Sequence, residues 1–527
     1  MEETKMKKII SIAFAAILAG FAISCQKEEA VSDKTDAVQY TFNITVNDRV
    51  GFDSEVSTKG ATAPTYKSEW GNGDKIFLFF KPTSGSLLTD TYATLTYNGS
   101  SWNGAKTGTT SLGNGGTLSA VYVYKLDGSV TPAYSDSKWT IATGNTFYNC
   151  QTGVDYTISD NVISASLDLV APADFVCFSI YGTSNGSLTC DKVKGWKDVV
   201  IGSEMTFSNA TCTGYMTGFD NIDGSYKDYY GRIVGGGTTL KGVTCKFSVV
   251  KGGKVYEHTA TPSSDKRSFY MDVRTDGDKP WTEAAGKLPG LFTVGKGADG
   301  KAGTADDVQV RFSQGNMYWD GDSFEFEANQ YSINSTWSTD HVSHFYWNKD
   351  ASLAYAESNN ETGASASDNF FTNSDQTTAK AEFTVNGQTN VWRTLSHDEW
   401  KYLFENHNYN HDKYVSVNGK SGIVIAPDGF SGTIEDSYDA TAWATAESNG
   451  FVFLPITGYR SGSIISEKEG STISCLYWTS TALGKHEEDG CYLANRMFFQ
   501  WKGSSLDHNF DSDARREWAI GVRLVSD

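Results

Sequence analysis

An acidic, glycine-rich loop in the second half of the chain has residue types that could bind a metal ion. Residues 297–307 contain three glycines together with Asp299, Asp306 and Asp307. Glycines permit tight turns, and carboxylate oxygens are ligands that calcium prefers. The loop departs from an EF-hand because it lacks alternating Asp or Asn residues and a terminal Glu. Two interpretations stay open: a small calcium site formed by the three aspartates, and an acidic hairpin tip without a metal.

The other chemical groupings do not indicate a catalytic centre. His341 and His344, like His407 and His411, have spacings that a metal could use on a helix. Neither pair includes the glutamate of a His-Glu-x-x-His site, so we expect surface histidines. No nucleophile elbow, phosphate loop or dinucleotide fingerprint rises above chance occurrence. We therefore expect a protein that is not an enzyme.

Length, charge and composition restrict the class of protein. The chain has 44 Lys and Arg against 63 Asp and Glu, a net charge of -19 that argues against nucleic-acid binding. The 52 Gly and only 9 Pro favour short strands joined by tight turns. A chain of 527 residues is too long for one core, so we expect three or four domains rich in β-structure.

The N-terminal residues have the pattern of an export signal. Lys7 and Lys8 precede an apolar run over residues 9–21, which is too short to span a bilayer. The run and the following cysteine resemble a bacterial lipoprotein signal, and residues 26–29 resemble the surface-export tag of Bacteroidota lipoproteins. The resemblance implies that residues 1–24 are removed, that Cys25 carries the lipid anchor, and that residues 25–36 tether a surface-exposed outer-membrane lipoprotein. The alternative is an ordinary cleaved signal with an incidental cysteine.

Tryptophan, histidine and cysteine divide the mature chain into two parts. Nine of 14 Trp and seven of eight His follow Pro289, whereas five of the seven cysteines after Cys25 precede it. An exported protein can form disulfides, but seven is odd, so at least one cysteine stays free. Small and turn-forming residues over 281–290 indicate a linker, and we place the junction near residue 286.

The first part reads as a series of antiparallel strands. Apolar and polar residues alternate strictly over residues 38–46, the period of a strand with one buried face. Further strands are predicted at residues 75–80, 92–97, 120–124, 162–170, 175–181, 244–250 and 268–273. Short strands without crossover helices suggest sandwiches, and the length suggests two, over residues 37–156 and 157–285.

This part resembles the fimbrillin-like pilus proteins of Bacteroidota. The resemblance rests on the leader, the first strand, residues 58–61, and above all Trp70-Gly71-Asn72-Gly73-Asp74 leading into an apolar strand. It implies two tandem fimbrillin/transthyretin-like β-sandwiches and contacts with other pilus subunits. Such subunits are thought to polymerise by donating a terminal strand. A further domain follows here, so we expect a tip or accessory subunit. We expect Trp70 to pack on the core and Gly73-Asp74 to turn the chain.

The second part mixes helices with strands. Ser396 and Glu399 form a capping box, and Trp400, Leu403 and Phe404 share one helical face, which predicts a helix over residues 396–407. A second helix is predicted over residues 438–448. Strands are predicted at residues 308–312, 451–454, 476–479, 492–501 and 518–525. The pattern predicts an α+β domain over residues 286–527.

Five motifs in this domain, in the right order, resemble the C-type-lectin-like modules of Bacteroidota surface proteins. They occupy residues 312–316, 392–400, 453–460, 477–481 and 521–525. We expect Trp392, Trp400 and Trp478 to be core residues, and Arg393 and Arg523 to be buried hydrogen-bond donors.

The resemblance also implies a ligand face and a disulfide. The face lies before the terminal strand, where aromatic, cationic and amide groups suit sugars and protein surfaces. Its candidate residues are Arg496, Trp501, His508, Asn509, Phe510, Arg515, Arg516 and Trp518. A disulfide between Cys475 and Cys491 is expected. Formylglycine-generating oxidases, distantly related in fold, would instead use the two thiols to bind copper.

We therefore expect a surface lipoprotein adhesin that binds a glycan or protein ligand. The main alternative is a structural pilus or anchor component without an external ligand. Apart from the open question of calcium, no cofactor is expected.

Overall fold

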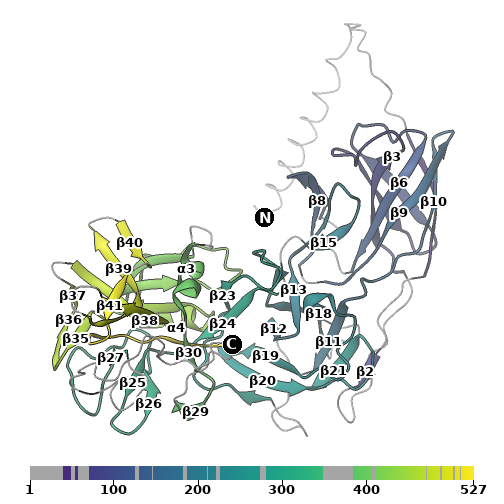
Figure 1. Ribbon diagram of the computed structural model, residues 1–527. Helices are drawn as coiled ribbons and strands as arrows, with labels where there is room; N and C mark the ends of the chain where they lie inside the picture. The colour runs from purple at the N-terminus through teal and green to yellow at the C-terminus, as the bar shows by residue number, and fades with distance from the viewer. Residues whose placement is uncertain are drawn as a thin grey trace, which may run out of the picture.

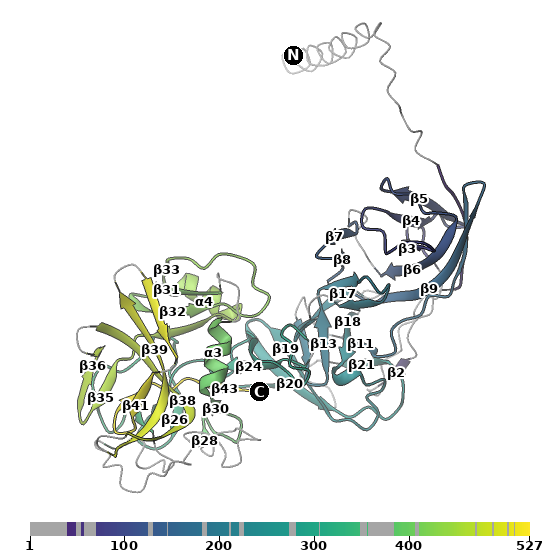
Figure 2. The same cartoon turned by 45° about the horizontal axis from the view of Figure 1, so that its top comes forward.

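The computed structural model describes residues 39–48, 54–56, 70–124, 130–144, 146–181, 187–209, 212–220, 226–272, 281–304, 306–347, 356, 384–405, 411–469, 472–486, 490–502, 505–510 and 512–527. The protein is mostly β-sheet, in three units that we call the first, second and third. The second unit lies between the other two (Figures 1 and 2). The export signal, Cys25 and residues 58–61 lie outside the described residues. None of the described helices is both long and apolar enough to cross a membrane.

The first unit is built on a seven-stranded sheet in the order β1-β10-β9-β6-β3-β4-β5. Its strands are β1 (Thr41–Val46), β3 (Lys75–Pro82), β4 (Tyr92–Tyr97), β5 (Trp102–Thr107), β6 (Gly115–Val123), β9 (Tyr148–Ser159) and β10 (Val162–Leu167). The two sheet edges touch, because the ring of Phe42 on β1 occupies the space that a Cβ on Gly104 of β5 would need. The sheet is therefore strongly curled.

A smaller sheet covers the first one. It has the order β15-β14-β8-β7, with β7 (Ala133–Ser135), β8 (Lys138–Ala142), β14 (Asp198–Ile201) and β15 (Phe207–Asn209). Between the sheets, Phe79 contacts Trp139 and Phe207 with ring centroids 5.5 and 6.3 Å apart. These contacts form a sandwich core.

The expected boundary between residues 156 and 157 falls inside strand β9. β9 continues to Ser159 and turns at Asp160 and Asn161, which both have positive φ, into its antiparallel partner β10. β14 and β15 also complete the first unit, although they follow residue 157. The chain thus returns to the first unit after starting the second, and strand patterns alone do not reveal such a return.

The Trp70 motif has the structural role expected from the sequence. The indole of Trp70 meets the rings of Tyr122 and Trp102 edge to face, at 4.9 and 5.0 Å, and its Nε1 donates to the carbonyl of Asn47 at 2.9 Å. Gly73 has a φ of 94°, which makes the turn into β3 possible.

The second unit is a single sheet that folds over its own core. Its main path is β2-β21-β11-β18-β13-β12-β19-β20-β22, with β16 and β17 at its side. The rings of Phe178 on β11 and Phe247 on β19 lie 5.0 Å apart, although four strand spacings, about 19 Å when flat, separate the two strands. The two layers of this unit therefore belong to one continuous sheet. Its strands are β2 (Ser54–Val56), β11 (Phe175–Tyr181), β12 (Ser187–Cys190), β13 (Val193–Trp196), β16 (Cys212–Thr213), β17 (Met216–Asp220), β18 (Tyr226–Ile233), β19 (Cys245–Lys251), β20 (Lys254–Ala260), β21 (Ser268–Asp272) and β22 (Thr282–Glu283).

The first and second units share apolar side chains. Phe175 at the start of β11 packs against Tyr148 of the first unit at 4.7 Å and against Trp196 at 4.6 Å. All three side chains belong to the buried core of the first unit. The opposite face of β11, with Val176 and Phe178, lines the core of the second unit.

The third unit places its two helices among short sheets. α3 (His397–Glu405) and α4 (Ala440–Ser448) confirm the two predicted helices. In the capping box, the Ser396 N–H donates to Glu399 at 2.7 Å and the Glu399 N–H donates to the Ser396 hydroxyl at 3.2 Å. One sheet, β23-β24-β43-β30, combines the first and last strands of the unit, β23 (Phe292–Gly295), β24 (Val308–Phe312), β30 (Arg393–Thr394) and β43 (Leu524–Ser526).

The other strands of the third unit form four sheets. Their strands are β25 (Met317–Trp319), β26 (Phe324–Phe326), β27 (Phe345–Tyr346), β28 (Thr384–Val385), β29 (Gln388–Thr389), β31 (Asp412–Val417), β32 (Lys420–Ile425), β33 (Ser437–Tyr438), β34 (Val452–Pro455), β35 (Tyr459–Ser461), β36 (Ile464–Ser466), β37 (Lys468–Glu469), β38 (Thr472–Lys485), β39 (Tyr492–Lys502), β40 (Ser505–Asn509), β41 (Asp513–Arg515) and β42 (Ala519–Ile520). The residues expected as scaffold, Trp392, Trp400, Trp478, Arg393 and Arg523, are all buried.

The second and third units meet through a tightly packed polar junction. The chain passes directly from Trp281, in the core of the second unit, to Leu288, in the core of the third. Lys194 of β13 donates to Gln309 of β24 at 2.7 Å, and Gln309 donates to Asp428 at 2.8 Å. Burial lowers the pKa of Lys194. The expected linker is therefore ordered and packed.

Candidate functional site

The arginines of the predicted ligand face are largely used inside the fold. Arg516 is 1 % exposed, lies 4.1 Å from the ring centroid of Trp347, and donates to the carbonyl of Leu493 at 3.0 Å. Arg496 is 5 % exposed and donates to Ser512 at 3.0 Å. These two predicted ligand contacts are therefore corrected to structural residues, because both side chains are buried and each donates from its Nε to a neighbouring segment.

The aromatic residues of the predicted face divide in a similar way. Phe510 is buried and stacks with Phe404 of α3 at 5.6 Å. Trp518 is half-buried and stacks on Tyr459 at 5.2 Å. Phe510 is thus a core residue, and Trp518 has one face covered.

The other predicted ligand residues lie on strands around β39. Trp501 is near the end of β39, and the register pairs Phe499 with His508 and Phe498 with Asn509 of β40. Arg515 lies on β41, which pairs with the first half of β39, and its side chain is exposed. The sheet therefore places these candidates on β39 and on the strands β40 and β41 that pair with its two halves, and only Arg515 among the described side chains is exposed.

The acidic loop does not arrange its aspartates as a set of metal ligands. Their oxygens accept hydrogen bonds from the loop itself: Asp299 from the Lys301 N–H at 2.8 Å, Asp306 from the Asp299 N–H at 3.0 Å, and Asp307 from the Gly303 N–H at 2.7 Å. The Asp299 N–H lowers the pKa of Asp306, whereas burial raises the pKa of Asp307. Across the described part of the chain, no group of three or more acidic, His or Cys residues could hold a metal. The loop connects the antiparallel strands β23 and β24, so the hairpin interpretation fits it better than the calcium site.

Cys475 and Cys491 do not form the expected disulfide. Cys475 is buried, its thiol donates to the carbonyl of Pro455 at 3.3 Å, and burial raises its pKa. The β38–β39 register places Cys475 opposite Phe499, eight residues from Cys491, or about 26 Å along the strand. A disulfide needs Cα atoms within about 7 Å, so this pairing is wrong, and the copper-binding thiol pair is not formed either.

Earlier in the chain, Cys190 and Cys245 lie on the neighbouring strands β12 and β19 with their thiols in contact. None of the seven described cysteines forms a disulfide.

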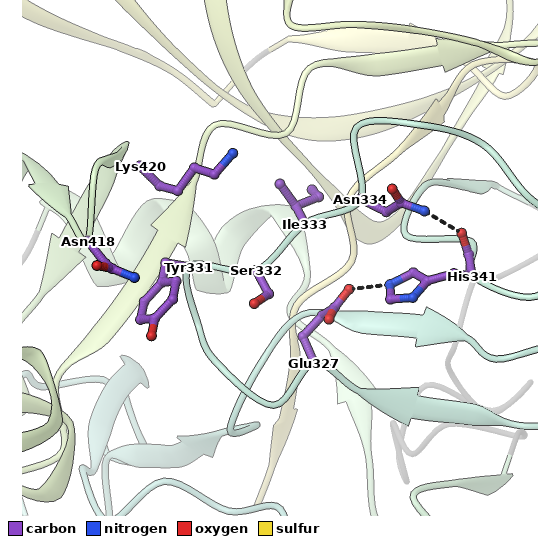
Figure 3. Close-up of a pocket in the computed structure, with 8 residues that line it drawn as sticks. All are labelled: Glu327, Tyr331, Ser332, Ile333, Asn334, His341, Asn418 and Lys420. Carbon is purple, nitrogen blue, oxygen red and sulfur yellow. Dashed lines mark hydrogen bonds and ion pairs between the residues drawn. The ribbon is translucent and has the colours of Figure 1, made fainter. Parts of the chain in front are cut away.

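An open pocket of about 470 Å³ lies in the third unit, in a place that the sequence did not indicate (Figure 3). One wall is the segment that follows β26, and the other is the turn between β31 and β32. The lining residues are Glu327, Tyr331, Ser332, Ile333, Asn334, His341, Asn418 and Lys420.

Glu327 supplies a buried carboxylate to this pocket. Its side chain is 8 % exposed, and its Oε1 accepts from His341 Nε2 at 2.8 Å and from the Ser343 hydroxyl at 3.2 Å. The His341 ring stacks on Tyr318 at 4.5 Å, and the Asn334 amide donates to the His341 carbonyl at 3.0 Å. The imidazole and the carboxylate are therefore held in place before any ligand arrives.

A buried amide fixes the backbone beneath the same wall. Gln330 is fully buried, donates to the Phe451 carbonyl at 3.0 Å, and accepts from Arg523 at 2.6 Å. Burial lowers the pKa of Arg523 to about 10. Because Gln330 adjoins Tyr331, this network anchors the pocket wall to the core.

A tight hairpin turn forms the opposite wall. Asn418 and Gly419 have φ values of 46° and 78°, as in the two-residue turns that join antiparallel strands. The Asn418 N–H donates to the Tyr438 carbonyl at 2.8 Å. Lys420 is exposed and extends toward Ile333 across the pocket (Figure 3).

One of the histidines expected at the surface is instead buried. His344 is buried, and its Nε2 donates to the Thr457 carbonyl at 2.8 Å. His341 and His411 are half-buried, and His407 lies outside the described residues. The Asn-Gly dipeptide at 418–419 is typical of a hairpin turn and could have predicted one pocket wall, whereas no sequence pattern indicated Glu327.

Comparisons with known proteins give weak likenesses only. No family model matches the chain, and no curated protein matches it. A solved structure of a putative adhesin from Bacteroides ovatus ATCC 8483 is 11% identical, with a TM-score of 0.20, and covers 44% of this chain and 92% of its own. A fimbrial protein from Bacteroides ovatus ATCC 8483 is 10% identical, with a TM-score of 0.20, and covers 93% of this chain and 99% of its own. At these values neither likeness establishes the fold or the function.

Proposed function

We propose that this protein is a surface adhesin whose third unit recognises a ligand. The observation that carries the proposal is the open pocket, in which fixed polar groups surround a space of about 470 Å³. This volume lies within the range of about 300–1,000 Å³ that is typical of small-molecule sites. The first and second units act as a stalk, and Cys25 supplies a lipid anchor in the outer membrane.

The packed junctions support a stalk that presents its head in one orientation. Phe175 joins the first and second units, and the bond from Lys194 to Gln309 joins the second and third. A pre-organised binding surface loses less entropy on association than one on a flexible tether.

We further propose that the third unit is lectin-like and that the subunit is an accessory or tip component. The order of the five motifs and the pairing of its first and last strands support a lectin-like fold. β43 lies between β24 and β30, so it is not available for donation to a neighbouring subunit. The strands beside β39, with Trp501, His508, Asn509 and Arg515, form a second candidate contact surface.

Binding of the whole mature chain to cells and glycans tests the proposal. The chain with Cys25→Ser, which keeps the protein soluble, is applied to intact host and bacterial cells, a glycan array and purified pilus subunits. We expect saturable binding to cells or glycans. Binding to pilus subunits alone would favour the structural alternative, and no binding to any of the three would overturn both.

A further inference from the structure

We infer that the Glu327 pocket binds a neutral, hydroxyl-rich sugar unit, such as a hexose or an N-acetylhexosamine. The inference rests on the proposed function, because it names the ligand class of the third unit. It depends on the juxtaposition of a buried carboxylate, an imidazole, two amides, an amine and an aromatic ring around one cavity (Figure 3).

The carboxylate of Glu327 calls for a ligand that donates hydrogen bonds. Oε1 is held by His341 and Ser343, whereas Oε2 accepts no hydrogen bond from any residue that the structure describes. The fold does not enclose Oε2, so a ligand that fills the pocket displaces its solvent and must donate a hydrogen bond in its place. A ligand hydroxyl supplies such a donor.

The charges around the pocket disfavour ions of either sign. An anion is attracted by Lys420, which has no ion pair within the described part of the chain, but repelled by Glu327, and the reverse holds for a cation, so an ion of either sign gains little. A neutral group that both donates and accepts hydrogen bonds can donate to Glu327 and accept from Lys420. Hydroxyl and acetamido groups have this property.

The remaining lining suits a sugar ring. Asn334 and Asn418 lie on opposite walls; the Asn334 amide already donates to the His341 carbonyl and accepts from the Thr336 N–H, which leaves one of its N–H donors for a ligand. Tyr331 and Ile333 are half-buried and provide apolar surface for the C–H faces of the ring. A mixed lining of this kind fixes the orientation of a polyhydroxylated ligand.

Titration calorimetry with the soluble mature chain tests the inference. The probes are neutral hexoses and N-acetylhexosamines, with a uronic acid and a primary amine as comparators. We expect a neutral sugar to bind, and Glu327→Gln to weaken it at least about tenfold, because a hydrogen bond to a charged acceptor is lost. Lys420→Ala, which removes an exposed side chain, should weaken binding about threefold with the unfolding temperature unchanged.

Glu325→Gln is the matched control, since Glu325 lies two residues away on β26 and does not line the pocket. It should bind as the parent chain does. Equal binding by the Glu327→Gln chain, or preference for the acid or the amine, would overturn the inference and leave the adhesin proposal intact. Cell binding without any sugar binding would do the same, whereas loss of cell binding as well would remove the adhesin proposal.

Discussion

The final strands of the third unit and the Glu327 pocket use the same kinds of side chain for opposite purposes. In the final strands, Arg496 and Arg516 are buried. Arg496 donates a hydrogen bond to Ser512, and Arg516 donates to a carbonyl oxygen. In the pocket, Lys420 and Asn418 are exposed, and Glu327 keeps one oxygen unused. A cation next to an aromatic ring indicates a binding face only where the fold leaves both accessible.

Two pairs of neighbours show this difference within a few residues. Arg515 is exposed, whereas the guanidinium of Arg516 packs against the ring of Trp347. His341 lines the pocket, whereas His344, three residues later, is enclosed in the core. Each pair offers a matched experiment in which residue type is constant and only the environment changes.

Replacement of Arg516 should have the largest effect. Arg516→Ala removes the stack on Trp347 and the hydrogen bonds that Arg516 donates to the carbonyls of Leu493 and Leu483, so we expect about 2–4 kcal/mol less stability. Arg515→Ala should change it by less than about 0.5 kcal/mol. Thermal unfolding followed by circular dichroism measures both. Equal losses would mean that the two arginines do not differ in environment.

Acid should weaken the fold through His344. Burial lowers the pKa of His344 to about 4, compared with about 6.5 when the chain is unfolded. Between these values the unfolded chain binds the extra proton, so this contribution is complete above pH 6.5 and is lost as the pH falls toward 4. The total is about 3 kcal/mol.

Urea unfolding at several pH values measures this slope. His344→Gln keeps a donor for the Thr457 carbonyl without titrating, so its stability should depend less on pH in this window. His341→Gln, in the pocket, is the comparator. A His344→Gln chain with an undiminished slope would assign the acid sensitivity to other groups.

Calcium should have the smallest effect. The oxygens of Asp299, Asp306 and Asp307 already accept hydrogen bonds from their own loop, so we expect millimolar calcium to leave the unfolding temperature unchanged relative to a chelator. A rise that disappears in the Asp306→Asn chain would restore the calcium interpretation.

Strands and helices with strong local patterns could be predicted from the sequence. The strands at Tyr92–Tyr97, Phe175–Tyr181 and Val308–Phe312 agree with the predicted bounds, and the capping box at Ser396 begins α3. These elements depend on periodicity and on contacts three residues apart, which a sequence displays directly.

The pocket and the return of the chain to the first unit could not be predicted in this way. Glu327 and Lys420 are 93 positions apart, and only the packing of β26 near the β31–β32 hairpin brings them to one cavity. β14 pairs with β8 across some 60 residues for the same reason. The burial of Arg516 likewise depends on Trp347, which is remote in the chain.

The packing at both junctions determines how the molecule carries load. Aromatic side chains bind the first unit to the second, and Gly253 of the second unit lies so close to Ser448 of α4 that a side chain at Gly253 would displace its neighbour. A force applied to a ligand in the third unit would therefore be transmitted through the two packed junctions to the first unit. Movement of the first unit would likewise displace the pocket of the third unit with it.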